Sequence, residues 1–130
     1  MENKEMYKEQ ILELYKNPLN FGVLESPDII VEEFNTLCGD KITLSLILNK
    51  ENNIVKDIKF KGKGCAISIA SASLITELVK GKKINKILNL GVKDIENLLN
   101  IKISPARVKC ATLALDAIKN ELNKQNQRKE

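Results

Sequence analysis

The sequence predicts an α+β protein in which a small antiparallel sheet of three strands carries helices packed on one face. Hydrophobic residues alternate with a period of two in the first half of the chain and recur every three or four residues in the second half. Strands that come before helices, instead of alternating with them, are typical of α+β domains. We expect one domain over residues 1–130, with flexible tails at about 1–5 and 124–130.

The first half of the chain is predicted to contain a helix and three strands. A helix over residues 3–16 ends at Asn17, because the residue before Pro18 avoids the helical conformation. The strands are expected at 29–34, 41–48 and 54–60. The inward-facing positions predicted for the last two strands are Ile42, Leu44, Leu46, Leu48, Ile54, Ile58 and Phe60.

The second half is predicted to be helical. A helix over residues 66–80 stops at Gly81, and two short helical turns follow at 84–88 and 92–98. Ser104 is a suitable N-cap for the last helix, with Pro105 at its first position. That helix runs to about residue 124 along a hydrophobic seam of Val108, Ala111, Leu115, Ile118 and Leu122.

Composition excludes several classes of protein. The chain is 43% hydrophobic and 29% charged with a net charge of +4, and its lysines are largely scattered. Aromatic residues make up only 4%, so few side chains could stack on bases, and we expect no nucleic-acid partner. No apolar run is long enough to span a bilayer, and the polar N-terminal segment does not resemble a signal peptide. We therefore expect a cytoplasmic protein without a membrane partner.

Three cysteines and no histidine restrict the chemistry. An odd number of cysteines in a chain without secretory features argues against a disulfide framework. The absence of histidine removes the commonest general base and metal ligand. Any reaction here must use thiolates, carboxylates and lysines.

Each cysteine occupies a different local setting. Cys38 lies in "TLCGDK" between the first two strands, with Asp40 two residues later. Cys65 ends the loop "GKGC" at the start of a helix, where partial positive charge favours a thiolate. Cys110 is expected in the second turn of the last helix, with Arg107 three residues before it.

These four residues have two interpretations. The cysteines could be small buried hydrophobes, and Asp40 a turn residue that binds its own backbone. If the loops and helix starts converge, the residues form instead a site of three sulfurs and one oxygen, suited to tetrahedral Zn²⁺ or an iron–sulfur cluster. Their spacing alone is a weak signal, since it contains no CxxC pair.

Three separated motifs, "CGDKITLSL", "GKGCAISIASASLITELVKGK" and "PARVKCATLALDAI", resemble the U-type iron–sulfur cluster assembly scaffold family, which includes IscU, SufU and the N-terminal domain of NifU. The resemblance covers residues 7–122, nearly the whole chain. It implies a non-enzymatic scaffold that accepts persulfide sulfur from a cysteine desulfurase and iron, and that passes a transient [2Fe–2S] cluster to apo-proteins.

The resemblance also assigns roles to individual residues. Cys38, Cys65 and Cys110 match the cluster-binding and persulfide-accepting cysteines of the family. Asp40 matches the aspartate that tunes cluster lability or binds the metal. A carboxylate is a poorer ligand for iron than a thiolate, so such a site should hold its cluster loosely enough to release it.

Two departures from the IscU pattern leave an alternative open. Lys109 replaces a histidine, and "ISPAR" replaces the chaperone-recognised "LPPVK", which makes a dedicated Hsp70 partner doubtful. "RVKCATLA" and "ASAS" are closer to SufU, although this chain has no room for the extra segment of that branch. The alternative function is a zinc-dependent sulfurtransferase in which the same four residues bind Zn²⁺ and no cluster is built. A purely structural zinc module is a third reading. Whether Lys109 is a solvated residue or assists Cys110 stays open.

Overall fold

The structure, a computed structural model, describes residues 3–36 and 39–129. Its elements in chain order are α1 (Asn3–Lys16), β1 (Ile29–Asn35), β2 (Asp40–Asn49), β3 (Ile54–Lys63), α2 (Ala66–Val79), α3 (Ile84–Ile87), α4 (Val92–Leu99), the 3₁₀ helix η1 (Pro105–Arg107) and α5 (Val108–Lys129). The predicted helices and strands are present with small shifts of their ends. We expected tails at both ends of the chain; residues 3–5 and 124–129 are the outer ends of α1 and α5.

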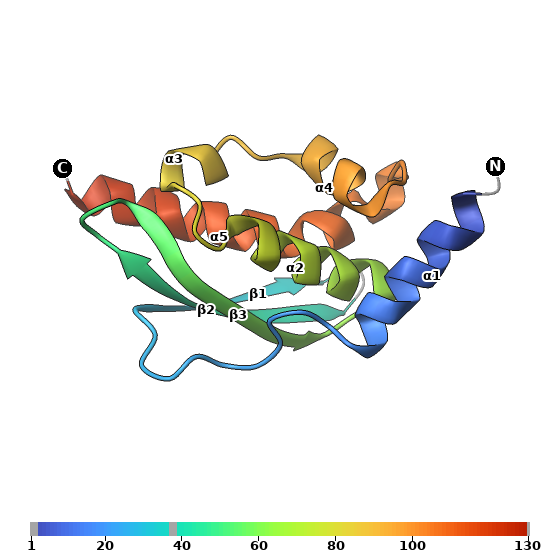
Figure 1. Ribbon diagram of the computed structural model, residues 1–130, viewed down its shortest axis with the longest axis horizontal. Helices are drawn as coiled ribbons and strands as arrows, with labels where there is room; N and C mark the ends of the chain where they lie inside the picture. The colour runs from blue at the N-terminus through green and yellow to red at the C-terminus, as the bar shows by residue number, and fades with distance from the viewer. Residues whose placement is uncertain (1–2, 37–38, 130) are drawn as a thin grey trace.

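The three strands form an antiparallel sheet in the order β1-β2-β3. Helices α2 and α5 lie along one face of this sheet, with α3 and α4 above them (Figure 1). Helix α5 packs against β1 and β2, and α2 packs against β3. The predicted α+β fold, with its helices on one face, is confirmed. Among the described residues, the core between these layers is aliphatic apart from Phe60.

The end of the β2–β3 hairpin differs from the predicted alternation. Ile42, Leu44 and Leu46 are fully buried as expected, but the register shifts between Ile47 and Leu48. The shift leaves Leu48 half-buried. In β3 it turns Val55 into the core, and Ile54 is only half-buried. An extra residue in one strand reverses the faces beyond it, so a strict period of two failed here.

Helix α2 begins and ends close to the predicted positions. Its last turn is followed by Lys80 in an extended conformation and by Gly81 at a φ of 79°, which L side chains rarely adopt. Helix α5 begins later than expected. Pro105 and Arg107 form the 3₁₀ turn η1 instead, so Cys110 lies in the first turn of α5 rather than the second. Among the described residues, no helix is both long and apolar enough to cross a membrane.

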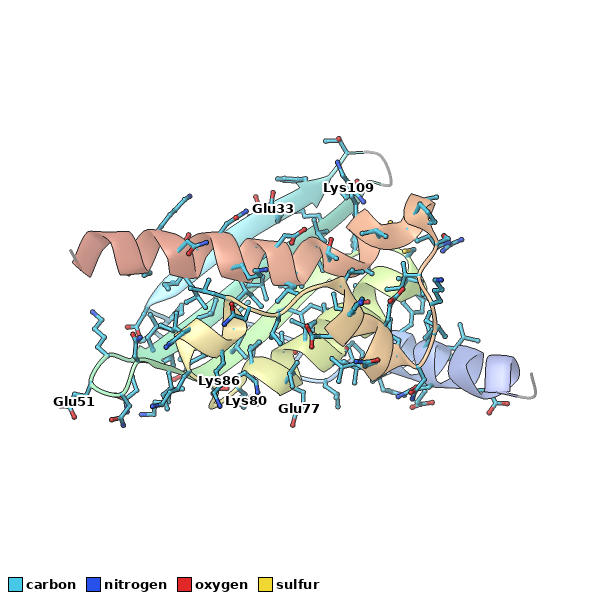
Figure 2. The ribbon with its side chains drawn as sticks, turned by 90° about the horizontal axis from the view of Figure 1, so that it is seen from above. Glu33, Glu51, Glu77, Lys80, Lys86 and Lys109 are labelled. Atoms are coloured by element: carbon cyan, nitrogen blue, oxygen red, sulfur yellow. The ribbon has the colours of Figure 1, made fainter. Side chains whose placement is uncertain are left out.

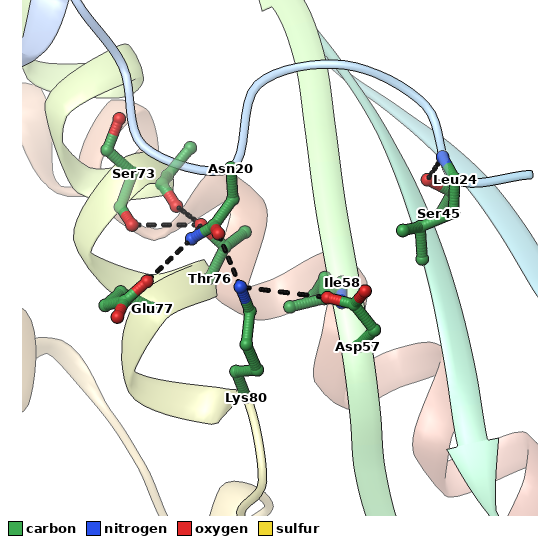
Figure 3. Close-up of polar contacts among 10 residues, drawn as sticks. Asn20, Leu24, Ser45, Asp57, Ile58, Ser73, Thr76, Glu77 and Lys80 are labelled. Atoms are coloured by element: carbon green, nitrogen blue, oxygen red, sulfur yellow. Dashed lines mark hydrogen bonds and ion pairs between the residues drawn. The ribbon is translucent and has the colours of Figure 1, made fainter.

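The connection from α1 to β1 crosses the face of the sheet that the helices leave open (Figure 1). Around Phe21 it pairs with the free edge of β3, with Gly22 donating to the carbonyl of Phe60. Side-chain bonds hold it in place: Asn20 donates to Thr76 and accepts from Lys80, and the backbone of Leu24 donates to Ser45 (Figure 3). A backbone edge that could pair with other chains is thereby partly covered.

Candidate metal centre

The carboxylate of Asp40 is buried at the end of the sheet. Asp40 is the first residue of β2, lies opposite Asn35 of β1, and is 2% exposed. Its oxygen Oδ1 accepts the backbone N–H of Cys65 at 3.2 Å, and Oδ2 accepts the hydroxyl of Ser68 at 2.5 Å. A buried carboxylate needs such donors. The carboxylate thus faces α2, and among the described residues its hydrogen-bond donors belong to Cys65 and Ser68.

Cys65 is the N-cap residue of α2 and follows directly on β3. Its side chain is half-buried, and its sulfur lies 3.5 Å from the hydroxyl of Ser68. Gly64, the residue before it, brings the chain close to the carboxylate: a Cβ at this position would lie 2.8 Å from Oδ1 of Asp40. The predicted start of a helix at Cys65 is confirmed, and glycine is needed beside it because a larger residue would displace Asp40.

Glycine is also required at position 62, because the neighbouring backbone leaves no room for a side chain. A Cβ there would lie 2.1 Å from the carbonyl oxygen of Lys41 on the neighbouring strand. Neither Gly62 nor Gly64 is among the glycines with a positive φ. Packing against β2 and Asp40, rather than an unusual backbone conformation, requires both glycines of "GKGC".

Cys110 approaches the same point from α5. It is 3% exposed, and its sulfur accepts a hydrogen bond of 3.5 Å from the side-chain amide of Asn35 at the end of β1. The positively charged N-terminal ends of α2 and α5 therefore meet at the end of the sheet, which stabilises negative charge held there.

The structure brings three of the four predicted donors together. One ligand atom each from Asp40, Cys65 and Cys110 lie within 4.8 Å of one another. Ligands around tetrahedral zinc, with bonds of about 2.3 Å to sulfur, are separated by about 3.8 Å. A small contraction would fit the three donors to one ion, so two thiols and a carboxylate suit zinc or iron. The fourth predicted donor, Cys38, lies outside the described residues.

Sequence reasoning missed two polar residues beside these donors. Ser68 follows Cys65 by three positions, which is helical spacing, and this signal could have identified it. Asn35 contacts a sulfur atom 75 positions away, and no local pattern indicates such a contact.

Lys109 and Arg107, the basic neighbours of Cys110, are exposed. Lys109 lies beside the end of β1, further along which Glu33 is found (Figure 2). Lys109 and Glu33 line a hollow of about 300 Å³, and Asp116 also lines it. Lys109 therefore borders solvent, in agreement with the solvated reading of this residue.

A second hollow, of about 610 Å³, lies beside the Cys65 loop. It is lined by the end of α1 and by the glycine loop, and Tyr15, Phe21, Gly64 and Ile69 contribute to it. Tyr15 is 47% and Phe21 49% exposed, although both are large and hydrophobic. Exposed apolar side chains around a reactive residue are typical of a surface that another protein contacts.

This α+β fold brings thiols and a carboxylate together where strands end and helices begin. Such an arrangement is typical of small proteins that bind metal ions or carry sulfur. Comparison with known proteins identifies the group. Residues 6–130 match the model of the NifU-like N-terminal domain, and the chain belongs to this family.

Two relatives illustrate the range of the family. The zinc-dependent sulfurtransferase SufU of Bacillus subtilis is 39% identical over 137 aligned positions, covering 92% of this chain and 91% of SufU. The iron–sulfur cluster assembly scaffold protein IscU of Aquifex aeolicus is 40% identical over 123 positions, covering 92% of this chain and 78% of IscU.

A solved structure agrees with them. The crystal structure of FiSufU from Fervidobacterium islandicum, described as a candidate scaffold for the SUF system, superposes with a TM-score of 0.72 at 29% identity, over 88% of this chain and 94% of the other. The resemblance stated from the three sequence motifs is thereby confirmed.

Proposed function

We propose that this protein is a scaffold on which a labile [2Fe–2S] cluster is assembled and from which it passes to apo-proteins. The observation that carries the proposal is the meeting of Asp40, Cys65 and Cys110 in a chain of the NifU-like family. Iron–sulfur clusters are held by cysteine thiolates, and Cys38 would supply the third sulfur. Relatives with scaffold names support this assignment.

The local structure suits a cargo that must leave again. A carboxylate binds iron less tightly than a thiolate, and Asp40 already accepts two hydrogen bonds. Cys65 is half-buried rather than enclosed. A cluster held here would be close to the surface and would have one weak ligand, so transfer to a client is favoured over storage.

Sulfur would arrive as a persulfide from a cysteine desulfurase. In such a transfer the acceptor thiolate attacks the outer sulfur of the donor persulfide, a new S–S bond forms, and the donor cysteine leaves as thiolate. Cys65 is the better exposed of the two described cysteines. The hollow beside it, with Tyr15 and Phe21, is the surface we assign to the incoming partner. Both cysteines need a reducing compartment, which favours the cytoplasm.

A zinc-dependent sulfurtransferase is the second candidate, and the 39% identity to SufU favours it. In that case the same residues would hold a resident Zn²⁺, whose positive charge would stabilise a neighbouring thiolate. The donors present, two sulfurs and one carboxylate oxygen, fit zinc. The SufU alignment runs over 137 positions, more than the 130 residues of this chain, so SufU contains residues that this chain lacks.

Anaerobic reconstitution with iron, cysteine, a desulfurase and a thiol reductant, which reduces persulfide sulfur to sulfide, distinguishes the candidates. We expect a visible chromophore with about two irons and two sulfides per cluster, which then transfers to an apo-ferredoxin. Cys65→Ser should abolish it. Ser71→Ala should leave it unchanged, because Ser71 lies on the same helix but outside the centre. A colourless protein that keeps one zinc ion and still accelerates the desulfurase would instead establish the sulfurtransferase.

A further inference from the structure

The hydroxyl of Ser68 joins two of the candidate ligands. Ser68 lies in the first turn of α2 and is 2% exposed. Its Oγ is 2.5 Å from Oδ2 of Asp40 and 3.5 Å from the sulfur of Cys65. No other hydroxyl among the residues that the structure describes is hydrogen-bonded to Asp40.

A serine hydroxyl has one hydrogen, so it can donate fully to only one acceptor. A separation of 2.5 Å is in the range of a strong hydrogen bond to an ionised oxygen, whereas 3.5 Å to sulfur is a weak contact. The hydrogen of Ser68 therefore points at Asp40. Since Oδ1 accepts the N–H of Cys65, both oxygens of this carboxylate are engaged.

A metal ion that binds Asp40 has to share an oxygen with these donors. Hydrogen bonding withdraws electron density from the ligand atom, and it occupies one of the two lone pairs of that oxygen. The bond from Ser68 makes both of these demands on Oδ2 of Asp40. Its effect on metal binding is then mainly competitive.

We propose that Ser68 is a positioning residue that sets the lability of the centre, by competing with the metal for the Asp40 carboxylate. This inference rests on the proposed function, since it assumes that Asp40 holds metal. If Asp40 held an ion, the hydroxyl of Ser68 could turn toward the sulfur of Cys65, which is already within 3.5 Å. When the ion departs, Ser68 restores the closed carboxylate and so favours release.

The experiment uses zinc as the probe and needs no activity measurement. Zinc-loaded protein is mixed with excess chromogenic chelator in a stopped-flow instrument, and affinity is measured by competition with the same chelator. In Ser68→Ala we expect slower release and tighter binding, each by about tenfold or more, because the metal no longer has to displace a hydrogen bond to a charged group. Ser68→Thr keeps the hydroxyl and should restore the original rate.

Ser71→Ala is a matched control on the same helix. Ser71 is 1% exposed, and its hydroxyl has no hydrogen-bond partner among the described residues. The substitution removes the same atom from an equally buried site, and it should leave zinc release unchanged. If Ser68→Ala folds poorly by circular dichroism, Ser68→Val, which has the shape of the Ser68→Thr variant but lacks the hydroxyl, should show the same slow release.

The background variant Asp40→Ala tests the route of the effect. Adding Ser68→Ala to it should leave the rate of zinc release unchanged, because no carboxylate remains for Ser68 and the metal to compete for. Unchanged or faster release in Ser68→Ala alone would overturn the inference, as would a slowing that persists without Asp40. These results leave the scaffold proposal intact. A wild-type chain that binds neither zinc nor a cluster would instead remove the centre itself, and both proposals with it.

Discussion

The side-chain amide of Asn35 donates a hydrogen bond to the sulfur of Cys110 at 3.5 Å, across 75 positions of the sequence. Asn35 ends β1 and is 7% exposed, and Cys110 lies in the first turn of α5. The contact therefore ties the sheet to the last helix at the candidate metal centre. It also distinguishes the two sulfur atoms, because the described neighbour of the Cys65 sulfur is a hydroxyl.

Replacing Asn35 with alanine should weaken zinc binding by at least about tenfold. A cysteine must lose its proton before it binds metal, and an N–H donor stabilises the thiolate. This differs from Ser68, whose acceptor is a carboxylate. Competition with a chelator measures the affinity, and Asn52→Ala, in the exposed β2–β3 turn, is the control. Equal affinities for Asn35→Ala and wild type would contradict the role of this contact.

Gly62→Ala should destabilise the apo-protein by about 1–3 kcal/mol. Its new Cβ would lie 2.1 Å from a backbone carbonyl of β2, and a backbone atom cannot move aside without disturbing the sheet. Urea unfolding followed by circular dichroism gives the free energy of unfolding. Gly91→Ala is the matched control, because no atom lies within 4 Å of a Cβ there. If Gly62→Ala lowered the free energy of unfolding by no more than Gly91→Ala does, the two strands would be able to move apart easily, and the prediction would be wrong.

Gly64→Ala acts on the ligand instead of the fold. The added Cβ would lie 2.8 Å from Oδ1 of Asp40, so we expect the carboxylate to shift and zinc affinity to fall by about tenfold. Isothermal titration with zinc measures this. In an Asp40→Ala background the same substitution should have no further effect on affinity. A similar additional loss there would mean that Gly64 acts on Cys65 alone.

The register shift in the hairpin predicts an unusual order of stabilities. Val55→Ala should cost about 2 kcal/mol, because Val55 is fully buried. Ile54→Ala removes a larger group from a half-buried site and should cost less than about 1 kcal/mol. Denaturant unfolding of both variants compares them. If Ile54→Ala were the more destabilising of the two, Ile54 rather than Val55 would face the core, as the strict alternation of the sequence predicts.

Removing zinc should not unfold the protein. The core joins both layers through buried aliphatic side chains and does not depend on the candidate ligands. A chelated sample should therefore keep its helical circular dichroism and unfold cooperatively on heating. Loss of this signal on chelation would instead support a structural zinc module, whose folding depends on bound metal.

Much of this fold follows from the local sequence. Alternation in 41–48 and helical periodicity in 66–80 identify their elements, because a strand or a helix exposes its buried face at a fixed period. The structure departs from these predictions where the conformation of a segment depends on contacts with residues distant in the sequence. The bulge beside Leu48 depends on how two strands pair, and the start of α5 at Val108 depends on how the preceding 3₁₀ turn is placed.

The site divides in the same way. The sequence by itself determined which groups are available, namely three thiols, the nearby Asp40 and no histidine, and its motifs indicated their family. The resemblance implied a shared site, but only the tertiary structure decided that ligand atoms of Asp40, Cys65 and Cys110 lie within 4.8 Å of one another and that Ser68 and Asn35 hydrogen-bond to two of them. Chemical identity is a property of single residues, whereas proximity depends on the packing of α2 and α5 on the sheet. That packing is a sum of many weak contacts between distant segments, which no short stretch of sequence contains.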